Sequence, residues 1–141
     1  MILIIFVSLA FLLPYLAIGP AFSLWTIKGS PLLIIVGVLA VLSGLWQFKK
    51  AQTMVDPTHP DKASQLVTEG IYQYTSNPMY LGMALVLGAA VLKSGFVVSL
   101  VLLPLFIWYM TRFQIKPEEK VIQGIFAKEY TEYKLQVRRW L

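Results

Sequence analysis

GIYQYTSNPMYLG, residues 70–82, joins a polar, aromatic segment to an apolar run that continues to Leu92. Asn77 can cap a helix through its side-chain oxygen, and Pro78 suits the first helical position, where no N–H is needed. The unpaired N–H groups and the positive dipole end of such a helix favour an anion. The stretch therefore predicts a membrane helix that begins at Pro78 with an anion site at its start, although a capped helix with an interfacial tyrosine belt explains it equally well. The phenols expected around this start are those of Tyr72, Tyr74 and Tyr80.

The composition is that of an integral membrane protein. Of the 141 residues, 57% are hydrophobic and only 13% are charged, which is far from the mixture of a soluble domain. This length permits a single domain over residues 1–141. The chain has no cysteine, and His59 is its one histidine. One chain therefore cannot build a disulfide, a thiolate metal site or a multi-histidine metal site, and we expect no metal.

Apolar segments predict an all-α fold, a polytopic membrane protein with four transmembrane helices. The segments cover about 2–18, 31–48, 78–92 and 96–114, close to the roughly 20 residues that span a bilayer. A long polar loop, 49–77, separates the second span from the third. The first segment is interpreted as a retained span rather than a signal peptide, because no basic residue precedes its apolar core.

Two features of the later spans bear on packing. Gly82 and Gly88 in the third span would let another helix approach closely. Pro104 lies inside the fourth span and predicts a kink there, unless neighbouring groups satisfy the freed carbonyl.

The distribution of basic residues predicts the orientation. Only Lys28 and Lys93 lie on one side of the predicted membrane, and all the other cations lie on the opposite side. We therefore expect the polar loop and both termini to be cytoplasmic. This asymmetry also explains the net charge of +5, and the chain offers no nucleic-acid-binding module, so the expected partner is the lipid bilayer and not a nucleic acid.

A C-terminal amphipathic helix over 117–137 is predicted by apolar residues that recur at spacings of three and four. It is expected to be cytoplasmic and to lie on the membrane surface or over the polar loop, either as a simple anchor or as a lid. Its apolar stripe consists of Ile122, Phe126, Tyr130, Tyr133 and Val137.

Glu118 and Glu119 stand at the head of this helix, directly after Pro117. Acidic residues are common in a first helical turn because they complement the helix dipole. Their position suggests more, because the fourth span brings them to the membrane face at which Asn77 begins the third span, with Arg112 between. We expect these groups to form one site for a zwitterionic or cationic cofactor with a flat ring.

Several blocks in order resemble the isoprenylcysteine carboxyl methyltransferase family and related phospholipid methyltransferases. Together they cover about the C-terminal half to two-thirds of the chain. The blocks are LVTEGIY at 66–72, SNPMYLG at 76–82, Glu118-Glu119, FAKEYTEY at 126–133 and VRRW at 137–140.

The resemblance implies a membrane enzyme that transfers a methyl group from S-adenosylmethionine to a lipophilic acceptor at the cytoplasmic face. Arg112 is the candidate for orienting an anionic substrate group, and Arg112 and Glu118 are the predicted catalytic residues. The residues that the resemblance implies for the cofactor site are Leu66, Val67, Tyr72, Asn77, Pro78, Met79, Tyr80, Glu118 and Glu119.

The chain departs from the family pattern at two places. The usual Arg-His-Pro block is Ser76-Asn77-Pro78, so a neutral amide replaces a potential cation. The basic residue that precedes the glutamates is not clearly aligned, because Arg112 lies upstream and Gln114 is the other occupant of that place. The acceptor therefore stays open among a carboxylate, an amine and a hydroxyl.

Two other functions stay open. One is a membrane reductase that uses a nicotinamide cofactor, for which the chain is short. The other is a non-enzymatic four-helix transporter or scaffold, although the predicted spans contain no acidic residue that could couple ion movement.

Overall fold

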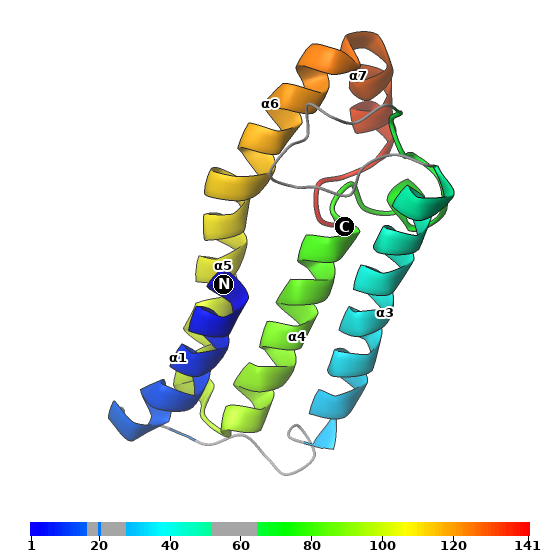
Figure 1. Cartoon of the computed structure of the whole chain (residues 1–141). Helices are drawn as coiled ribbons and strands as arrows, with labels where there is room; N and C mark the ends of the chain where they lie inside the picture. Colours follow the sequence, from blue (N-terminus) through cyan, green and yellow to red (C-terminus); the bar gives the residue numbers. More distant parts are fainter. Residues whose placement is uncertain (17–19, 21–27, 52–64) are drawn as a thin grey trace. The chain divides into compact units, whose positions relative to one another are not determined.

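The structure is a computed structural model that describes residues 1–16, 20, 28–51 and 65–141 (Figure 1). Regular secondary structure in these residues is helical, without strands, which confirms the all-α prediction. His59 and most of the predicted polar loop lie outside the described residues.

The chain divides into two compact units, each built from two separate segments. Helices α3 (Ser30–Lys50) and α4 (Pro78–Ser94) contribute residues to both units. The first unit contains residues 1–39 and 82–109, and the second contains residues 40–81 and 110–141.

The first unit is built from apolar helices, among them α1 (Ile2–Leu16) and α5 (Leu102–Met110). Its interior includes Phe106, which is fully buried, and the Phe6 ring meets the Phe106 ring edge-on with centroids 5.3 Å apart. Such edge-to-face pairs add to the stabilisation that burial of the rings provides.

Glycines bring helices close together in the first unit, as the sequence predicts for the third span. A Cβ atom added to Gly37 would lie only 2.8 Å from the backbone carbonyl oxygen of Gly82. A Cβ atom added to Gly88 would only reach ordinary van der Waals contact with Leu33 and Leu103, at 3.8 and 3.9 Å. Small residues permit this approach where larger side chains would separate the helices.

Pro104 is accommodated by a change of helix type. A 3₁₀ turn, η3 (Val97–Val101), precedes α5, so Pro104 is the third residue of that helix. The first N–H groups of an α-helix have no partner within the helix, so the proline removes no hydrogen bond from α5.

The predicted single tail helix over 117–137 is wrong. Helical structure runs without a stop from the apolar segment through η4 (Thr111–Ile115), a π-helical turn, into α6 (Lys116–Ile125). The chain breaks instead at Phe126, with φ −114° and ψ 38°, before α7 (Ala127–Gln136). Because of this break, apolar residues of α6 pack against apolar residues of α7 instead of lying along one straight helix.

These packed apolar residues of α6 and α7 form a hydrophobic core in the second unit. Tyr130, Tyr133 and Val137 are buried, and partly buried apolar side chains pack against them. Those side chains are Leu66, Ile122 and Phe126.

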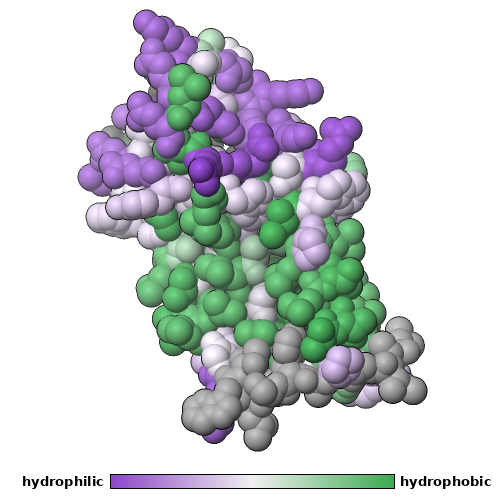
Figure 2. Space-filling model, turned by 180° about the vertical axis from the view of Figure 1, so that it is seen from behind, coloured by the Kyte–Doolittle hydropathy of each residue, from purple (hydrophilic) through white to green (hydrophobic). Residues whose placement is uncertain are grey.

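Among the residues that the structure describes, two helical runs are long and apolar enough to cross a membrane, Ser30–Lys50 and Val97–Ile125. The shorter apolar helices, Ile2–Tyr15 and Pro78–Ser94, do not reach that length, so four transmembrane helices stay a prediction. Many large apolar side chains on α1 and α3 are exposed, and Figure 2 shows hydrophobic surface gathered apart from hydrophilic surface on the face displayed. A lipid environment accommodates such surface better than water does.

Candidate functional site

A hydrogen-bonded group joins the start of α4 to the start of α6. The Tyr80 hydroxyl donates to Oε1 of Glu118 at 2.6 Å, and Nε2 of Gln114 donates to the same oxygen at 2.8 Å. Tyr80 is buried, and Glu118 is partly buried. Of the glutamate pair, Glu118 therefore contacts the start of α4, whereas a cofactor site shared by both glutamates stays a prediction.

The two oxygens of Glu118 differ in their surroundings. Oε1 accepts both hydrogen bonds, whereas Oε2 accepts none from the residues that the structure describes. Two donors on one oxygen fix the orientation of the carboxylate, because hydrogen bonds to a charged group are stronger than neutral ones. Among the described residues, Oε2 is thus the oxygen of Glu118 without a hydrogen-bond donor.

A π-helical turn that contains Gln114 directly precedes α6. The Lys116 N–H bonds to the Thr111 carbonyl, five residues back, so this turn is wider than an α-helical turn. Gln114 and Glu118 are four residues apart and share one face of the helix, as their hydrogen bond shows. Such turns are frequent at functional sites.

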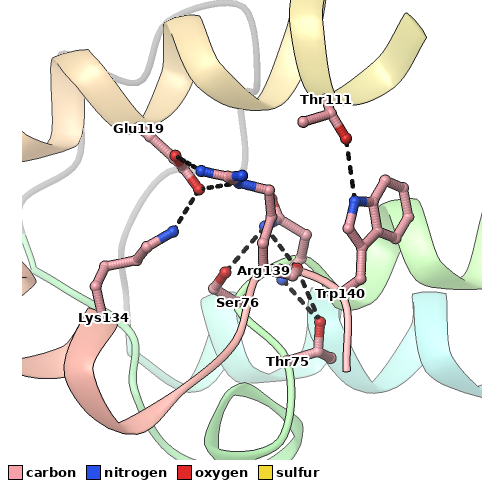
Figure 3. Close-up of polar contacts among 8 residues, drawn as sticks. Thr75, Ser76, Thr111, Glu119, Lys134, Arg139 and Trp140 are labelled. Carbon is pink, nitrogen blue, oxygen red and sulfur yellow. Dashed lines mark hydrogen bonds and ion pairs between the residues drawn. The ribbon is translucent and has the colours of Figure 1, made fainter. Parts of the chain in front are cut away.

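Glu119 has different partners from Glu118. Arg139 binds it with two nitrogens, Nε to Oε1 at 2.8 Å and Nη2 to Oε2 at 2.7 Å, and Nζ of Lys134 bonds to Oε1 at 2.6 Å (Figure 3). Both oxygens of Glu119 therefore hold the segment after α7. Because the Arg139 guanidinium donates to Glu119, the pKa of Arg139 is raised above its usual value.

That segment is also tied to the residues before α4. The Ser76 N–H donates to the Arg138 carbonyl at 3.0 Å, and the Thr75 hydroxyl donates to the Arg139 carbonyl at 3.3 Å. Beside this, Nε1 of Trp140 donates to the Thr111 hydroxyl at 3.1 Å (Figure 3). We call residues 138–140 the strap.

Asn77 occupies the expected position directly before α4. Its carbonyl accepts the Leu81 N–H at 2.9 Å, which is the first bond of the helix. Its side-chain amide has a role that the sequence does not indicate, because Nδ2 donates to the Arg139 carbonyl and to the Ser76 hydroxyl, both at 3.0 Å. The Asn77 N–H donates to the Thr75 hydroxyl at 3.1 Å. Polar groups at the predicted anion site are thus engaged with the strap and with each other.

The predicted aromatic surround is only partly present. Tyr72 is buried, and its carbonyl accepts a 2.7 Å hydrogen bond from the Tyr133 hydroxyl, but the side chain of Tyr74 is largely exposed. Burial raises the pKa of Tyr72, Tyr130 and Tyr133, so these phenols stay protonated.

Other predicted site residues have mixed surroundings. Pro78 is fully buried, and both Pro78 and Met79 pack against Gly44 of α3. Arg112 is exposed on η4, and in the described part of the chain no hydrogen bond or ion pair joins it to Tyr80 or Glu118.

A cavity of about 320 Å³ lies at the C-terminal end of α3 in the second unit. It includes Leu66 and Val67, two residues predicted for the cofactor site. Beside it, Gly70 has φ +61°, and a Cβ at that position would lie 1.9 Å from Nε2 of Gln47. The lining residues are Gln47, Lys50, Ala51, Gln65, Leu66, Val67, Thr68 and Glu69.

Sequence reasoning missed the roles of Arg139 and Lys134. Arg139 belongs to the block VRRW, which is part of the resemblance, but nothing in that block indicates a carboxylate partner 20 residues away. The break at Phe126 was not predicted either, although Gly124, a weak helix former, lies two residues before it.

Comparison with known proteins gives a consistent result. A model of the phospholipid methyltransferase family matches residues 25–129. Protein-S-isoprenylcysteine O-methyltransferase of Schizosaccharomyces pombe is 35% identical over 78 residues, which are 55% of this chain and 33% of the yeast protein. The matched part therefore spans about a third of that relative. An uncharacterised protein of Haemophilus influenzae is 40% identical over 63 residues, 45% of this chain and the whole of that protein. No solved structure matches the chain.

Proposed function

Because this chain belongs to the phospholipid methyltransferase family, we propose that it transfers a methyl group from S-adenosylmethionine to a lipophilic or membrane-embedded acceptor at the cytoplasmic face. The yeast relative is named for methylation of an isoprenylcysteine, which supports a lipophilic acceptor. A carboxylate, an amine and a hydroxyl are the acceptor groups that fit the sequence.

The residues of the second unit fit such a donor. The amino-acid part of the donor carries an ammonium group, which can donate a hydrogen bond to Oε2 of Glu118. The cavity beside Leu66 and Val67, about 320 Å³, lies at the lower end of the size range of small-molecule sites. When bound, S-adenosylmethionine would supply a methyl group on a positively charged sulfur; the acceptor would form a bond to the methyl carbon as the carbon–sulfur bond breaks, and the sulfur would leave as a neutral thioether.

The work of the protein is then to bind and align. Tyr80 and Gln114 hold Oε1 of Glu118 and so fix the direction in which Oε2 points. Such preorganisation lowers the entropy that the reacting groups lose when they are brought together. The hydrogen-bonded group of Tyr80, Gln114 and Glu118 is the observation that carries the proposal.

Whether the reaction needs a base depends on whether the acceptor group must lose a proton. A carboxylate acceptor is already an anion and needs none, whereas an amine or hydroxyl must lose a proton. Glu118 is the candidate base for such an acceptor only if the donor's ammonium group is bound elsewhere, because Oε2 is its one oxygen without a partner among the described residues. Arg112 stays the candidate for orienting an anionic acceptor that approaches the exposed side of η4.

Calorimetric titration of the purified protein in detergent tests the proposal. S-adenosylmethionine and its demethylated product should both bind saturably. Glu118→Gln should weaken binding of the donor by about tenfold to a hundredfold, because a hydrogen bond to a charged group is lost, and Tyr80→Phe by several-fold. Glu132→Gln, the same chemical change at an exposed site on α7, is the matched control and should bind as the wild type does.

The alternatives predict other results of the same titration. Saturable heat with a reduced nicotinamide nucleotide, and none with the methyl donor, would support the reductase. No binding of either class of nucleotide would leave the non-enzymatic transporter or scaffold.

A further inference from the structure

Two of the three nitrogens of the Arg139 guanidinium bind Glu119 and fix the orientation of the group. Nε and Nη2 bind the two oxygens of Glu119, and in the described part of the chain no hydrogen bond involves the third nitrogen, Nη1. The planar fork of arginine fixes where that nitrogen points once the other two are bound. The Arg139 side chain is 33% exposed, so a ligand can reach it.

Arg139 and Glu118 belong to one electrostatic neighbourhood. Glu118 and Glu119 are consecutive on α6, and Arg139 binds Glu119 through two nitrogens, so the guanidinium is held at the residue next to Glu118. Burial raises the pKa of Tyr130, the carboxylates of Glu119 and Glu118 raise it as well, and the Arg139 guanidinium lowers it. The cluster therefore offers a ligand one carboxylate oxygen and one guanidinium nitrogen, each without a partner among the described residues.

The start of α4 is less available to an anion than its sequence suggests. The Ser76 N–H is used by the Arg138 carbonyl, the Asn77 N–H by the Thr75 hydroxyl, and the Asn77 amide by the Arg139 carbonyl. The block at 76–78 also lacks a cation. An anionic group of a ligand therefore needs its positive partner elsewhere in the second unit.

We propose that Arg139 binds the carboxylate of the methyl donor through Nη1, while Glu118 binds its ammonium group through Oε2. The inference rests on the proposed function and adds the residue that recognises the amino-acid end of the donor. An amino acid carries its two charges on one carbon, so its recognition takes a cation and an anion in the same cluster, as Arg139 and Glu118 supply. Arg139 is a binding residue in this role, and Glu119 is the residue that positions it.

The experiment compares two ligands that differ only in the carboxylate, S-adenosylmethionine and decarboxylated S-adenosylmethionine, by calorimetric titration in detergent. The wild type should prefer the carboxylated compound by about tenfold to a hundredfold, the range for a hydrogen bond between charged groups. Arg139→Gln should abolish this preference by weakening only the carboxylated compound. Lys134→Gln, which removes the other cation from Glu119, is the matched control and should keep the preference.

Each result decides between the claims. Equal weakening of both ligands by Arg139→Gln overturns the proposal, since the residue would then support only the fold of the site. A wild type that binds both ligands equally overturns it and leaves the proposed function standing. A wild type that binds neither refutes the proposed function itself.

A further variant covers the case in which Arg139→Gln binds neither ligand. Arg139→Lys keeps a positive charge but loses the fork. A reduced preference with intact binding of the decarboxylated compound supports the carboxylate contact. An unchanged preference, or a second loss of both ligands, overturns it.

Discussion

Two adjacent glutamates show how far single residues can diverge in role. Successive residues on a helix point about 100° apart, so Glu118 and Glu119 face different neighbours. Glu118 meets Tyr80 and Gln114, whereas Glu119 meets Lys134 and Arg139. The sequence places both acids at the predicted site but does not assign their partners, and those of Glu119 lie beyond the break at Phe126.

Gly70 is the residue whose replacement should most clearly affect local backbone conformation. Its φ of +61° costs an L-residue roughly 1–2 kcal/mol, and Gln47 must also move to admit a Cβ. Gly70→Ala should therefore lower the stability of the protein in detergent, measured by thermal unfolding followed by circular dichroism.

Gly95 provides the control for this prediction. Its φ is +81°, but nothing lies within 4 Å of an added Cβ. Gly95→Ala should show the backbone cost alone, and Gly70→Ala should cost more because of Gln47. A smaller loss of stability from Gly70→Ala than from Gly95→Ala would contradict this account.

Among the elements, helix starts are predicted better from the sequence than helix ends. Pro78 marks the start of α4 because its missing N–H is a local property, whereas in the described part of the chain the predicted side-chain cap of Asn77 is not formed. The break at Phe126 accompanies packing of Tyr130 and Tyr133 against Ile122, a tertiary contact that the sequence does not show, although Gly124 lies two residues before the break. The same limit applies to the site, where Glu118 and Tyr80 were predictable and Arg139 was not.

Glu119 should stabilise the strap by more than an exposed ion pair usually contributes. Glu119 is mostly buried, with 16% of its side chain exposed, and Glu119→Gln leaves Lys134 and Arg139 without their anion. We expect a loss of about 1–3 kcal/mol, because charged groups then lose buried hydrogen bonds. Chemical denaturation in detergent measures it.

The pair Lys50–Glu69 gives the comparison. Its atoms are 3.4 Å apart, and the two side chains are 58% and 72% exposed. Glu69→Gln should change stability by no more than about 0.5 kcal/mol, because water screens exposed pairs. Equal losses from the two glutamine variants would mean that the strap contacts do not stabilise the second unit.

At the level of the whole molecule, the number of membrane crossings is a property that experiment can measure. Family membership and two long apolar helical runs support a membrane protein, and the basic residues predict where its surfaces lie. The number of crossings follows from neither observation alone, because two of the apolar helices are short.

The absence of cysteine makes the topology directly measurable. Lys93→Cys and Lys128→Cys each introduce a single thiol at an exposed position. With four spans, a membrane-impermeant maleimide should label Lys128→Cys from the cytoplasmic side and Lys93→Cys only from the opposite side. A cysteine placed before Met1 should be labelled together with Lys128→Cys. Labelling of all three from one side would refute the four-span topology.

The wide turn at Thr111–Ile115 has a consequence for chimeric proteins. Trp140 contacts Thr111 at its beginning, and Glu118 meets Tyr80 shortly after its end. Loss of one codon between these points would rotate the following residues by about 100° and separate the two contacts. Recombination with a relative at this place therefore has to preserve the number of residues more strictly than their types.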